Sequence, residues 1–489
     1  MNKFILSQAR AKLIFLLAGV IAAVAFSSGA SALPLFARQT GMVCSACHFQ
    51  HFPMLNGFGR AFESAGYTMM GVSQGKVEGE GLSIPSSLNM SALATAGYEK
   101  TNQAASQTVK STTGDGAFYL PGSGGELSLF FGGRLSENAG FLSEIGTGGS
   151  VSGTVVSGSH SSAKLPVLFP FTGIKFLDGT LAGFVPFSTD DHGASYGFEL
   201  LNTGSNAALQ MSPVPGLNGQ HSAALSAQQY IGTAGSATGV ALVANNANGF
   251  INLTKYDQVG ISSAALSTLG STYLRVAGMF ELAGWDTGVG IQSWSGSSVS
   301  PTGTPAVPAV PATPGNSGVN PVIFPTPAIP AVPATYGTVA SKAAAIDGQM
   351  QGSIGSLPVG FYLSYARAPA GDSNAYNMDP AAAVPGSAVT QAYGKATKSA
   401  FNFSFEVGVV PEKVTLGAGF RAGKSGVAIT SSAVANASDN AVMFVASYKL
   451  AQNMMLTFTQ TTSSGQYWDA NHQNALGSST STINLFALF

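Results

Sequence analysis

Short segments in which apolar residues alternate with polar or small ones recur along the chain. Residues 127–132 place Leu, Leu and Phe on one face, and residues 401–409 place five Phe or Val side chains opposite Asn, Ser, Glu and Gly. A period of two is typical of a β-strand whose two faces meet different surroundings. The pattern predicts an all-β protein with one apolar face and one polar face.

Several of these segments are joined in pairs by very few residues. The short connections lie near 137–139, 356–358, 410–413 and 451–453. The other connections are long and rich in Gly, Ser, Ala, Asn and Pro, near 100–124, 147–164, 203–225, 295–340, 368–395, 422–440 and 462–478. Short turns on one side of a membrane and long loops on the other are typical of bacterial outer-membrane barrels.

Composition favours the same architecture. Only 9% of the 489 residues are charged and 61 are glycine, yet no apolar stretch beyond the first 32 residues is long enough for a membrane helix. We expect a transmembrane barrel of about 16 antiparallel strands over residues 76–489. A soluble β-sandwich or a secreted low-complexity adhesin is the alternative, but a sandwich of this size would normally divide into domains.

Both ends of the chain carry features of an exported outer-membrane protein. Three basic residues precede an apolar run at 13–26 and the small residues 30–32, which predicts a signal peptide over 1–32 with cleavage after Ala32. The last strand, 481–489, ends on Phe489, which resembles the assembly signal of outer-membrane barrels. We therefore expect the outer membrane of a Gram-negative bacterium.

One connection has a different composition. Residues 301–333 repeat Pro-Ala-Val-Pro and Pro-Ala-Thr-Pro units. Proline removes ladder hydrogen-bond donors and favours the extended polyproline conformation, so we expect a surface loop that is neither strand nor helix.

Residues 44–48 read Cys-Ser-Ala-Cys-His and hold both cysteines of the chain. Two thiols at this spacing can add to the two vinyl groups of one haem, and the following His48 can supply an axial nitrogen to its iron. A redox disulfide or half of a zinc site would need the same cysteines. However, the flanks lack a βαβ pattern, and the histidines beyond residue 51 are scattered singly. The motif predicts one covalent haem c, bound by Cys44, Cys47 and His48.

The segment 33–75 around this motif is expected to be a small α-helical haem segment. The helical turn at the cysteines is expected to continue to His51, and a second helix to start at Pro53 and end at Gly66. About forty residues cannot bury a haem alone, so we expect the segment to lodge at or in the barrel lumen.

The sixth ligand of the haem iron has several candidates. His51 lies three residues after His48, and on one helix the two would share a face, so His51 would need a break in the helix to serve. Met69 and Met70 follow the Gly66 turn, where the chain could double back over the haem, and they are the favoured candidates. Met54 is a less favoured candidate. Arg38 and Arg60 could pair with haem propionates or form surface or periplasmic salt bridges.

The haem segment resembles that of the fused monohaem cytochrome-porins with which iron-oxidising bacteria oxidise iron at the outer membrane. The resemblance rests on Phe36-Ala37-Arg38-Gln39-Thr40-Gly41, the motif Cys44 to His48, Pro53, Leu55-Asn56, Phe58-Gly59-Arg60, Phe62 and Gly66-Tyr67-Thr68. It covers less than a tenth of the chain. The sequence departs from the family at Glu63, where the family has a lysine.

This resemblance implies an iron:cytochrome-type oxidoreductase that takes electrons from extracellular Fe(II) through its haem. It also implies a periplasmic cytochrome c or copper protein as electron acceptor, with outer-membrane lipid around the barrel and no nucleic-acid partner. Two alternatives remain: a haem conduit for another metal or mineral, and a solute porin with a haem-bearing plug. Apart from the resemblance, Asp190, Asp191 and His192 cluster in one loop-like stretch and form a hypothetical transient entry site for iron.

Overall fold

The structure is a computed structural model that describes residues 35–102, 116–147, 151–152, 155–156, 159–171, 179–204, 226–261, 267–304, 335–378, 393–427, 436–466 and 478–489. The predicted signal peptide, 1–32, lies outside this part of the chain. None of the helices in these ranges is long and apolar enough to cross a membrane.

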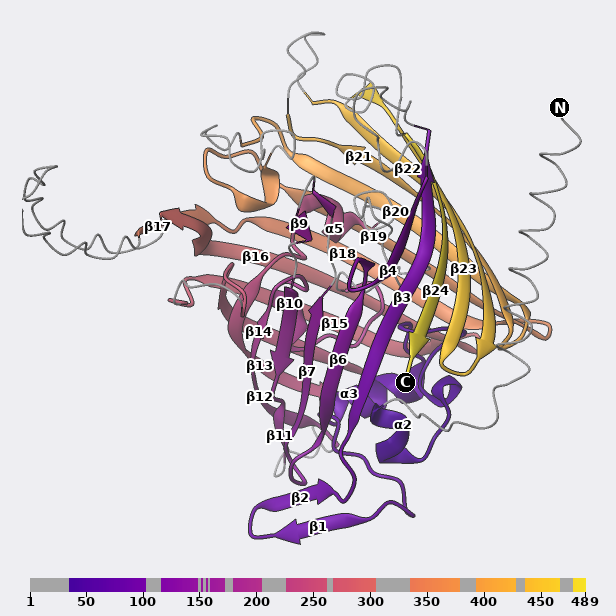
Figure 1. The fold of residues 1–489 in the computed structure, drawn as a ribbon. Coiled ribbons are helices and arrows are strands. Elements are labelled where there is room, and N and C mark those ends of the chain that lie inside the picture. Colours follow the sequence, from indigo (N-terminus) through magenta and orange to yellow (C-terminus); the bar gives the residue numbers. More distant parts are fainter. Residues whose placement is uncertain are drawn as a thin grey trace, which may run out of the picture.

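Twenty of the described strands close into one barrel, in which every pairing except the short β4–β5 contact is antiparallel (Figure 1). Its sixteen principal strands are β3 (Met90–Thr101), β6 (Leu127–Arg134), β7 (Gly140–Thr147), β10 (Ser159–Lys164), β12 (Leu181–Thr189), β13 (Ala237–Asn246), β14 (Gly249–Asp257), β15 (Ser271–Leu282), β16 (Trp285–Thr304), β18 (Ala343–Ile354), β19 (Leu357–Ala368), β20 (Lys398–Val410), β21 (Val414–Lys424), β22 (Ser438–Ala451), β23 (Met454–Ser464) and β24 (Ser479–Leu488). The closing strand β24 pairs with β3, so both edges of the sheet are satisfied. The predicted fold class and strand number are confirmed.

Smaller elements complete the described chain. Four short strands interrupt the ring: β4 (Ala117–Pro121), β5 (Gly124–Gly125), β11 (Val167–Pro170) and β17 (Thr335–Ala340). Two isolated hairpins are formed by β1 (Lys76–Gly79) with β2 (Leu82–Pro85) and by β8 (Val151–Ser152) with β9 (Val155–Val156). The helices are α2 (Leu35–Thr40), η1 (Cys44–Ala46), α3 (Gly57–Ser64), η3 (Ala194–Gly197), α5 (Ala227–Ile231) and η4 (Ala375–Asn377).

The two faces of the barrel wall differ as the alternation predicts. On β20, Phe401 and Phe405 are 39% and 38% exposed, whereas Asn402, Ser404 and Glu406 are buried in the lumen. Large apolar side chains with comparable exposure recur on the outer face around the barrel, as at Leu242, Ile346, Phe444 and Ile483. Closure, an apolar exterior and a polar interior are the properties of an outer-membrane barrel, which is the class and location of this protein.

The connections also agree with the predicted asymmetry, except at the proline-rich loop. β6–β7, β18–β19, β20–β21 and β22–β23 are joined by short turns at one end of the barrel. Strand β16 continues through Pro301 to Thr304, so the expectation of a loop from residue 301 is wrong for these four residues. The pairing of β16 with β17 shifts register between Val299 and Gly303, and such irregularities are where a strand accommodates proline. Residues 305–334 lie outside the described part.

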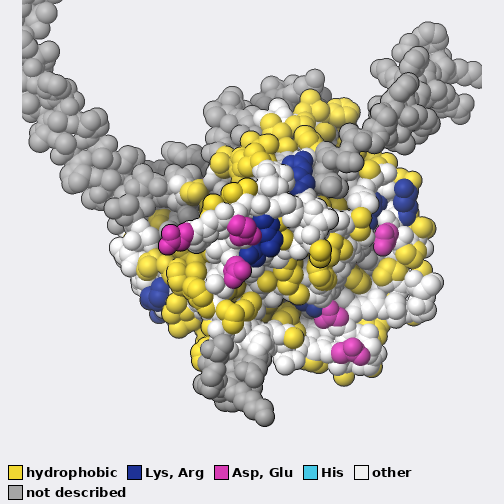
Figure 2. Space-filling view, turned by 90° about the horizontal axis from the view of Figure 1, so that it is seen from below, with side chains coloured by type: hydrophobic (Ala, Val, Ile, Leu, Met, Phe, Trp, Pro, Cys, Tyr) yellow, Lys and Arg dark blue, Asp and Glu magenta, His cyan; other side chains and the backbone are white. Residues whose placement is uncertain are grey.

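The N-terminal segment, residues 35–71, lies inside the barrel at the short-turn end, close to the C-terminus (Figure 1). Phe52 stacks on Phe486 of β24, with ring centroids 5.4 Å apart, and Arg60 forms an ion pair with Asp286, next to the β15–β16 turn. Seen from this end, Lys, Arg, Asp and Glu side chains are few among hydrophobic and uncharged ones (Figure 2). The predicted placement of the segment in the barrel mouth is confirmed.

The outward face of β20 allows a direct test of this membrane arrangement. We expect Phe405→Arg, near the middle of β20, to reduce the free energy of folding into a lipid bilayer by about 2–4 kcal/mol. Val410→Arg, at the short-turn end of the same strand, should cost only about 0–1 kcal/mol. Denaturant unfolding of both variants from phospholipid vesicles measures the difference, and equal costs would contradict this placement.

Candidate functional site

The haem-motif residues form one tight turn. Cys44–Ala46 make a single 3-10 turn, and the His48 amide donates to the Cys44 carbonyl at 3.0 Å. Both thiols are free and half-buried, and burial raises their pKa, so they stay protonated near neutral pH.

After His48 the chain reverses, contrary to expectation. His48 forms an isolated bridge with Leu55, and the Phe49 amide donates to the Met54 carbonyl at 2.8 Å. The predicted continuation of the helical turn to His51 is therefore wrong. So is the predicted helix start at Pro53, because α3 begins at Gly57.

Asn56 explains where α3 begins. Its Oδ1 accepts from the Gly59 amide at 2.9 Å, so Asn56 caps the helix. Its Nδ2 donates to the Ala46 carbonyl at 3.1 Å, and its amide donates to the Cys47 carbonyl at 2.9 Å. One side chain therefore fixes both the start of α3 and the turn that carries the cysteines.

Gly59 brings α3 against this turn. A Cβ atom at Gly59 would lie 2.1 Å from the Cys47 carbonyl oxygen, a separation that real Cβ atoms do not adopt. Only glycine allows the helix backbone to approach the turn this closely.

His48 has the properties of a metal ligand. Burial lowers the pKa of its imidazole to about 4, although the nearby Met54 and Pro53 carbonyls raise it. The ring is therefore neutral, which is the form that binds a metal. Its Nδ1 is buried and has no hydrogen-bond partner within the described ranges.

Apolar side chains of the same segment remain exposed. Met42, Val43, Phe58 and Met69 are 40%, 47%, 39% and 37% exposed. A porphyrin needs a neutral axial ligand and apolar cover, and the motif thiols supply its attachment points. The residues present therefore fit a covalently attached haem.

The candidate distal ligands differ in accessibility. Both ring nitrogens of His51 have partners, and Met54 is 1% exposed and packs against Tyr362 and Phe49. Met69 is 37% exposed and Met70 is half-buried. Of these four side chains, only the favoured pair is accessible, and the distal ligand stays a prediction.

The charged residues of the segment pair with the barrel wall. Buried Arg60 forms an ion pair with Asp286 and donates to Gln351, so a barrel carboxylate is its partner. Arg38 donates to the Met90 carbonyl. Arg60 therefore has the salt bridge that the second sequence interpretation allowed, whereas the partner shown for Arg38 is a main-chain carbonyl.

Glu63 of α3 has a cationic partner from the barrel. It accepts from Lys164 of β10 at 2.9 Å and from the Tyr67 hydroxyl at 2.7 Å. The Lys164 ammonium also lies 4.9 Å from the ring centroid of Tyr196 and 5.4 Å from that of Tyr67. Lys164 could not be predicted from the sequence, because no local pattern links strand β10 to helix α3.

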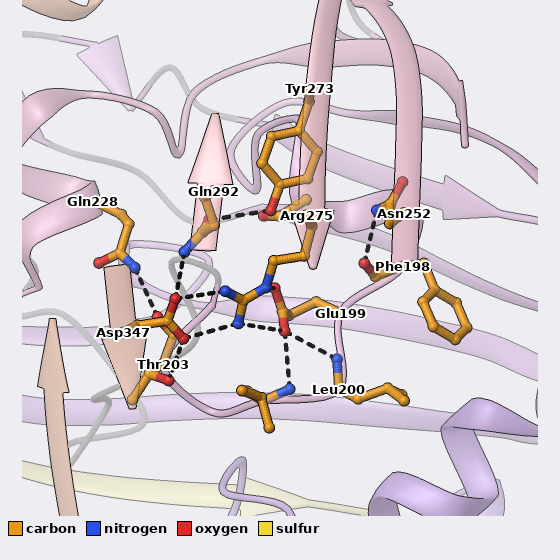
Figure 3. A network of polar contacts seen from close by, with 12 residues as sticks. Phe198, Glu199, Leu200, Thr203, Gln228, Asn252, Tyr273, Arg275, Gln292 and Asp347 are labelled. Carbon is orange, nitrogen blue, oxygen red and sulfur yellow. Dashed lines mark hydrogen bonds and ion pairs between the residues drawn. The ribbon is translucent and has the colours of Figure 1, made fainter. Parts of the chain in front are cut away.

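Residues 199–204, which follow β12, fold into the lumen and contact the N-terminal segment. Asn202 accepts from the Leu55 amide at 2.8 Å and donates to the Leu55 carbonyl at 2.9 Å. Next to it, Arg275 lies between Glu199 of this loop and Asp347 of β18 (Figure 3). The Arg275 guanidinium is 3.0 Å from Glu199 and 2.5 Å from Asp347.

The acidic run at 190–192 does not form a metal site with other residues. Across the described ranges, no group of three His, Cys, Asp or Glu side chains converges so that it could hold a metal ion. His192 stacks on Tyr196 with ring centroids 5.1 Å apart, and its Nε2 lies 3.4 Å from Asp191. The hypothetical iron contact therefore gains no geometric support.

Comparison with known proteins shows similarity in fold only. No protein-family model matches the chain, and no curated protein matches it. Salmonella typhi OmpF in complex with daunomycin is 8% identical, with 85% of this chain and 100% of that chain covered and a TM-score of 0.45. OmpT, an outer membrane protein of Vibrio cholerae, is 7% identical, with 85% and 99% covered and a TM-score of 0.41. The outer membrane channel DcaP of Acinetobacter baumannii is 7% identical, with 82% and 97% covered and a TM-score of 0.41.

The buried Glu199 should make the stability of residues 199–204 depend on pH. Burial raises its pKa from 4.5 to about 7; Arg275 lowers it and Asp347 raises it. Because the pKa of Glu199 is higher in the folded state, the protonated carboxyl stabilises the folded state. This contribution is complete below about pH 4.5 and is lost as pH rises through about 7, by up to ~3 kcal/mol. Hydrogen exchange at residues 199–204, corrected for intrinsic rates, should accelerate over this range. Glu199→Gln should remove this dependence, and an unchanged profile in that variant would contradict the assignment.

Gly59→Ala tests the contact between α3 and the attachment turn. In an ordinary helix this substitution stabilises by about 0.5–1 kcal/mol, but here the methyl group meets the Cys47 carbonyl and should destabilise by about 1–3 kcal/mol. Faster hydrogen exchange of residues 44–64 in Gly59→Ala would report this loss of stability. Gly57→Ala is the matched control, because its methyl group would be 3.2 Å from the end of the Asp286 side chain, which can move. Equal exchange in the two variants would exclude a tight contact.

Proposed function

We propose that this protein is an outer-membrane c-type cytochrome that accepts electrons from extracellular Fe(II) and passes them to a soluble periplasmic carrier. The observation that carries the proposal is the position of Cys44, Cys47 and His48 on one turn inside the mouth of a closed membrane barrel. A bound haem c would supply reversible one-electron chemistry at its iron.

The residues of the chain have separate roles in this proposal. Cys44 and Cys47 attach the group, His48 binds its iron, and Asn56 holds the turn in place. Met69 or Met70 would complete the coordination, and a thioether ligand raises the reduction potential relative to a second histidine. A higher potential suits Fe(II) as the donor. Because electron transfer requires no acid or base, no further catalytic residue is assigned.

The barrel accounts for the direction of transfer. The segment lies at the short-turn end, which faces the periplasm in bacterial outer-membrane barrels. A soluble cytochrome c or copper protein could therefore approach it without crossing the lipid. Oxidation at the outer membrane would leave insoluble Fe(III) outside the cell.

A solute porin with a plug is the second candidate, and the closed sixteen-strand barrel favours it. In that case, Cys44→Ala/Cys47→Ala would retain solute flux in a liposome swelling assay and no property would depend on haem. A haem conduit for another metal or mineral differs from the main proposal only in the donor.

An anaerobic optical titration tests the proposed function. We expect Fe(II) to reduce the c-type haem of the detergent-purified wild type, and the reduction to be lost in His48→Ala because the axial nitrogen is gone. Dithionite is the control reductant for both proteins. A haem that dithionite reduces but Fe(II) does not would indicate another electron donor. A wild type without haem would leave the solute porin as the remaining candidate function.

A further inference from the structure

Because the chain reverses after His48, His51 does not have the position it would have on a helix that continued from the cysteines. On a continuous helix His51 would share a face with His48, but the 3-10 turn ends at Ala46 and the chain folds back. Helix geometry therefore does not keep His51 from the iron that His48 would bind. Another interaction must do so if a methionine is the distal ligand.

His51 has a partner at each ring nitrogen. Its Nε2 lies 2.7 Å from Oε2 of Glu406, and its Nδ1 lies 2.8 Å from the Phe52 carbonyl oxygen. Side-chain exposure is 3% for His51 and 1% for Glu406. A buried carboxylate without its partner costs several kcal/mol, so the pair resists separation.

The barrel wall holds the carboxylate from a second side. The Tyr362 hydroxyl on β19 donates to Oε1 of Glu406 at 2.8 Å and accepts from Nε2 of Gln351 at 3.2 Å. Gly360 pairs with Glu406 across the two strands, and a Cβ atom there would lie 2.5 Å from the Tyr362 hydroxyl oxygen. The glycine therefore leaves room for the tyrosine beside the carboxylate. Tyr362 also packs on Met54.

We propose that Glu406 and Tyr362 are positioning residues that keep His51 off the haem iron and leave the distal position to a methionine. The inference rests on the proposed haem at Cys44–His48. Its physical consequence is a higher reduction potential, because histidine in the distal position would lower it. The barrel wall thereby sets a property of the segment it encloses.

Glu406→Ala in the full-length protein tests the proposal. We expect the released imidazole to replace the distal ligand, which would give the ferric haem a bis-histidine signature in electron paramagnetic resonance and near-infrared circular dichroism, with a lower reduction potential. Glu406→Ala/His51→Ala should restore the wild-type signature and potential. Glu406→Gln and Tyr362→Phe keep the side-chain volumes and should shift the potential in the same direction by less.

The control is His51→Ala alone, which should leave the wild-type ligand signature unchanged. Loss of that signature would show that His51 is itself a ligand and overturn the proposal. An unchanged potential and spectrum in Glu406→Ala, in a barrel that still shows heat-modifiable migration, would also overturn it. None of these measurements uses Fe(II), so a failed iron titration leaves the inference intact. A wild type without covalent haem would overturn both proposals.

Discussion

The absence of water in the hydrocarbon core of a membrane is the constraint on which this structure depends. Every backbone N–H and C=O group at that depth must find a partner in the protein, and the pairing of β24 with β3 removes the last free edge. Closure also determines the side chains: Phe401 and Phe405 face lipid, whereas Asn402, Ser404 and Glu406 face inward. A segment too small to form its own core is thus surrounded by a wall that offers polar partners.

Those polar partners hold the N-terminal segment in place. Arg60 pairs with Asp286, Glu63 with Lys164 and His51 with Glu406, and the wall residues come from strands far apart in sequence. A buried ion pair rarely adds much stability compared with apolar packing, but loss of one partner leaves an uncompensated buried charge. Asp286 is 36% exposed, so this cost applies to Glu63–Lys164 and His51–Glu406, whose side chains are at most 16% exposed. These two pairs therefore favour one orientation of the segment.

Local patterns predicted the barrel well because strand formation depends on a period that is visible within ten residues. The alternation at 401–409 gave the orientation of β20, and the turn at 451–453 connects β22 to β23 as expected. The prediction that a helix starts at Pro53 was wrong, because the general preference of proline for the first helical turn competes with the specific cap at Asn56. Asn56 bonds to Gly59 and to the motif turn at once, and that double role depends on the fold-back of the chain.

The partners of the site residues could not be predicted, because barrel closure decides which strands face them. Glu406 precedes the β20–β21 turn by a few residues, and its sequence neighbourhood gives no reason to pair it with His51, which lies 355 residues earlier. Asn202 likewise reaches Leu55 only because residues 199–204 after β12 fold inward. The segment thus meets the wall on its sides and these residues within the lumen. Each of these contacts joins residues too far apart in sequence for a local pattern to link them, so the position of the segment in the barrel mouth is a property of the closed barrel and not of the segment alone.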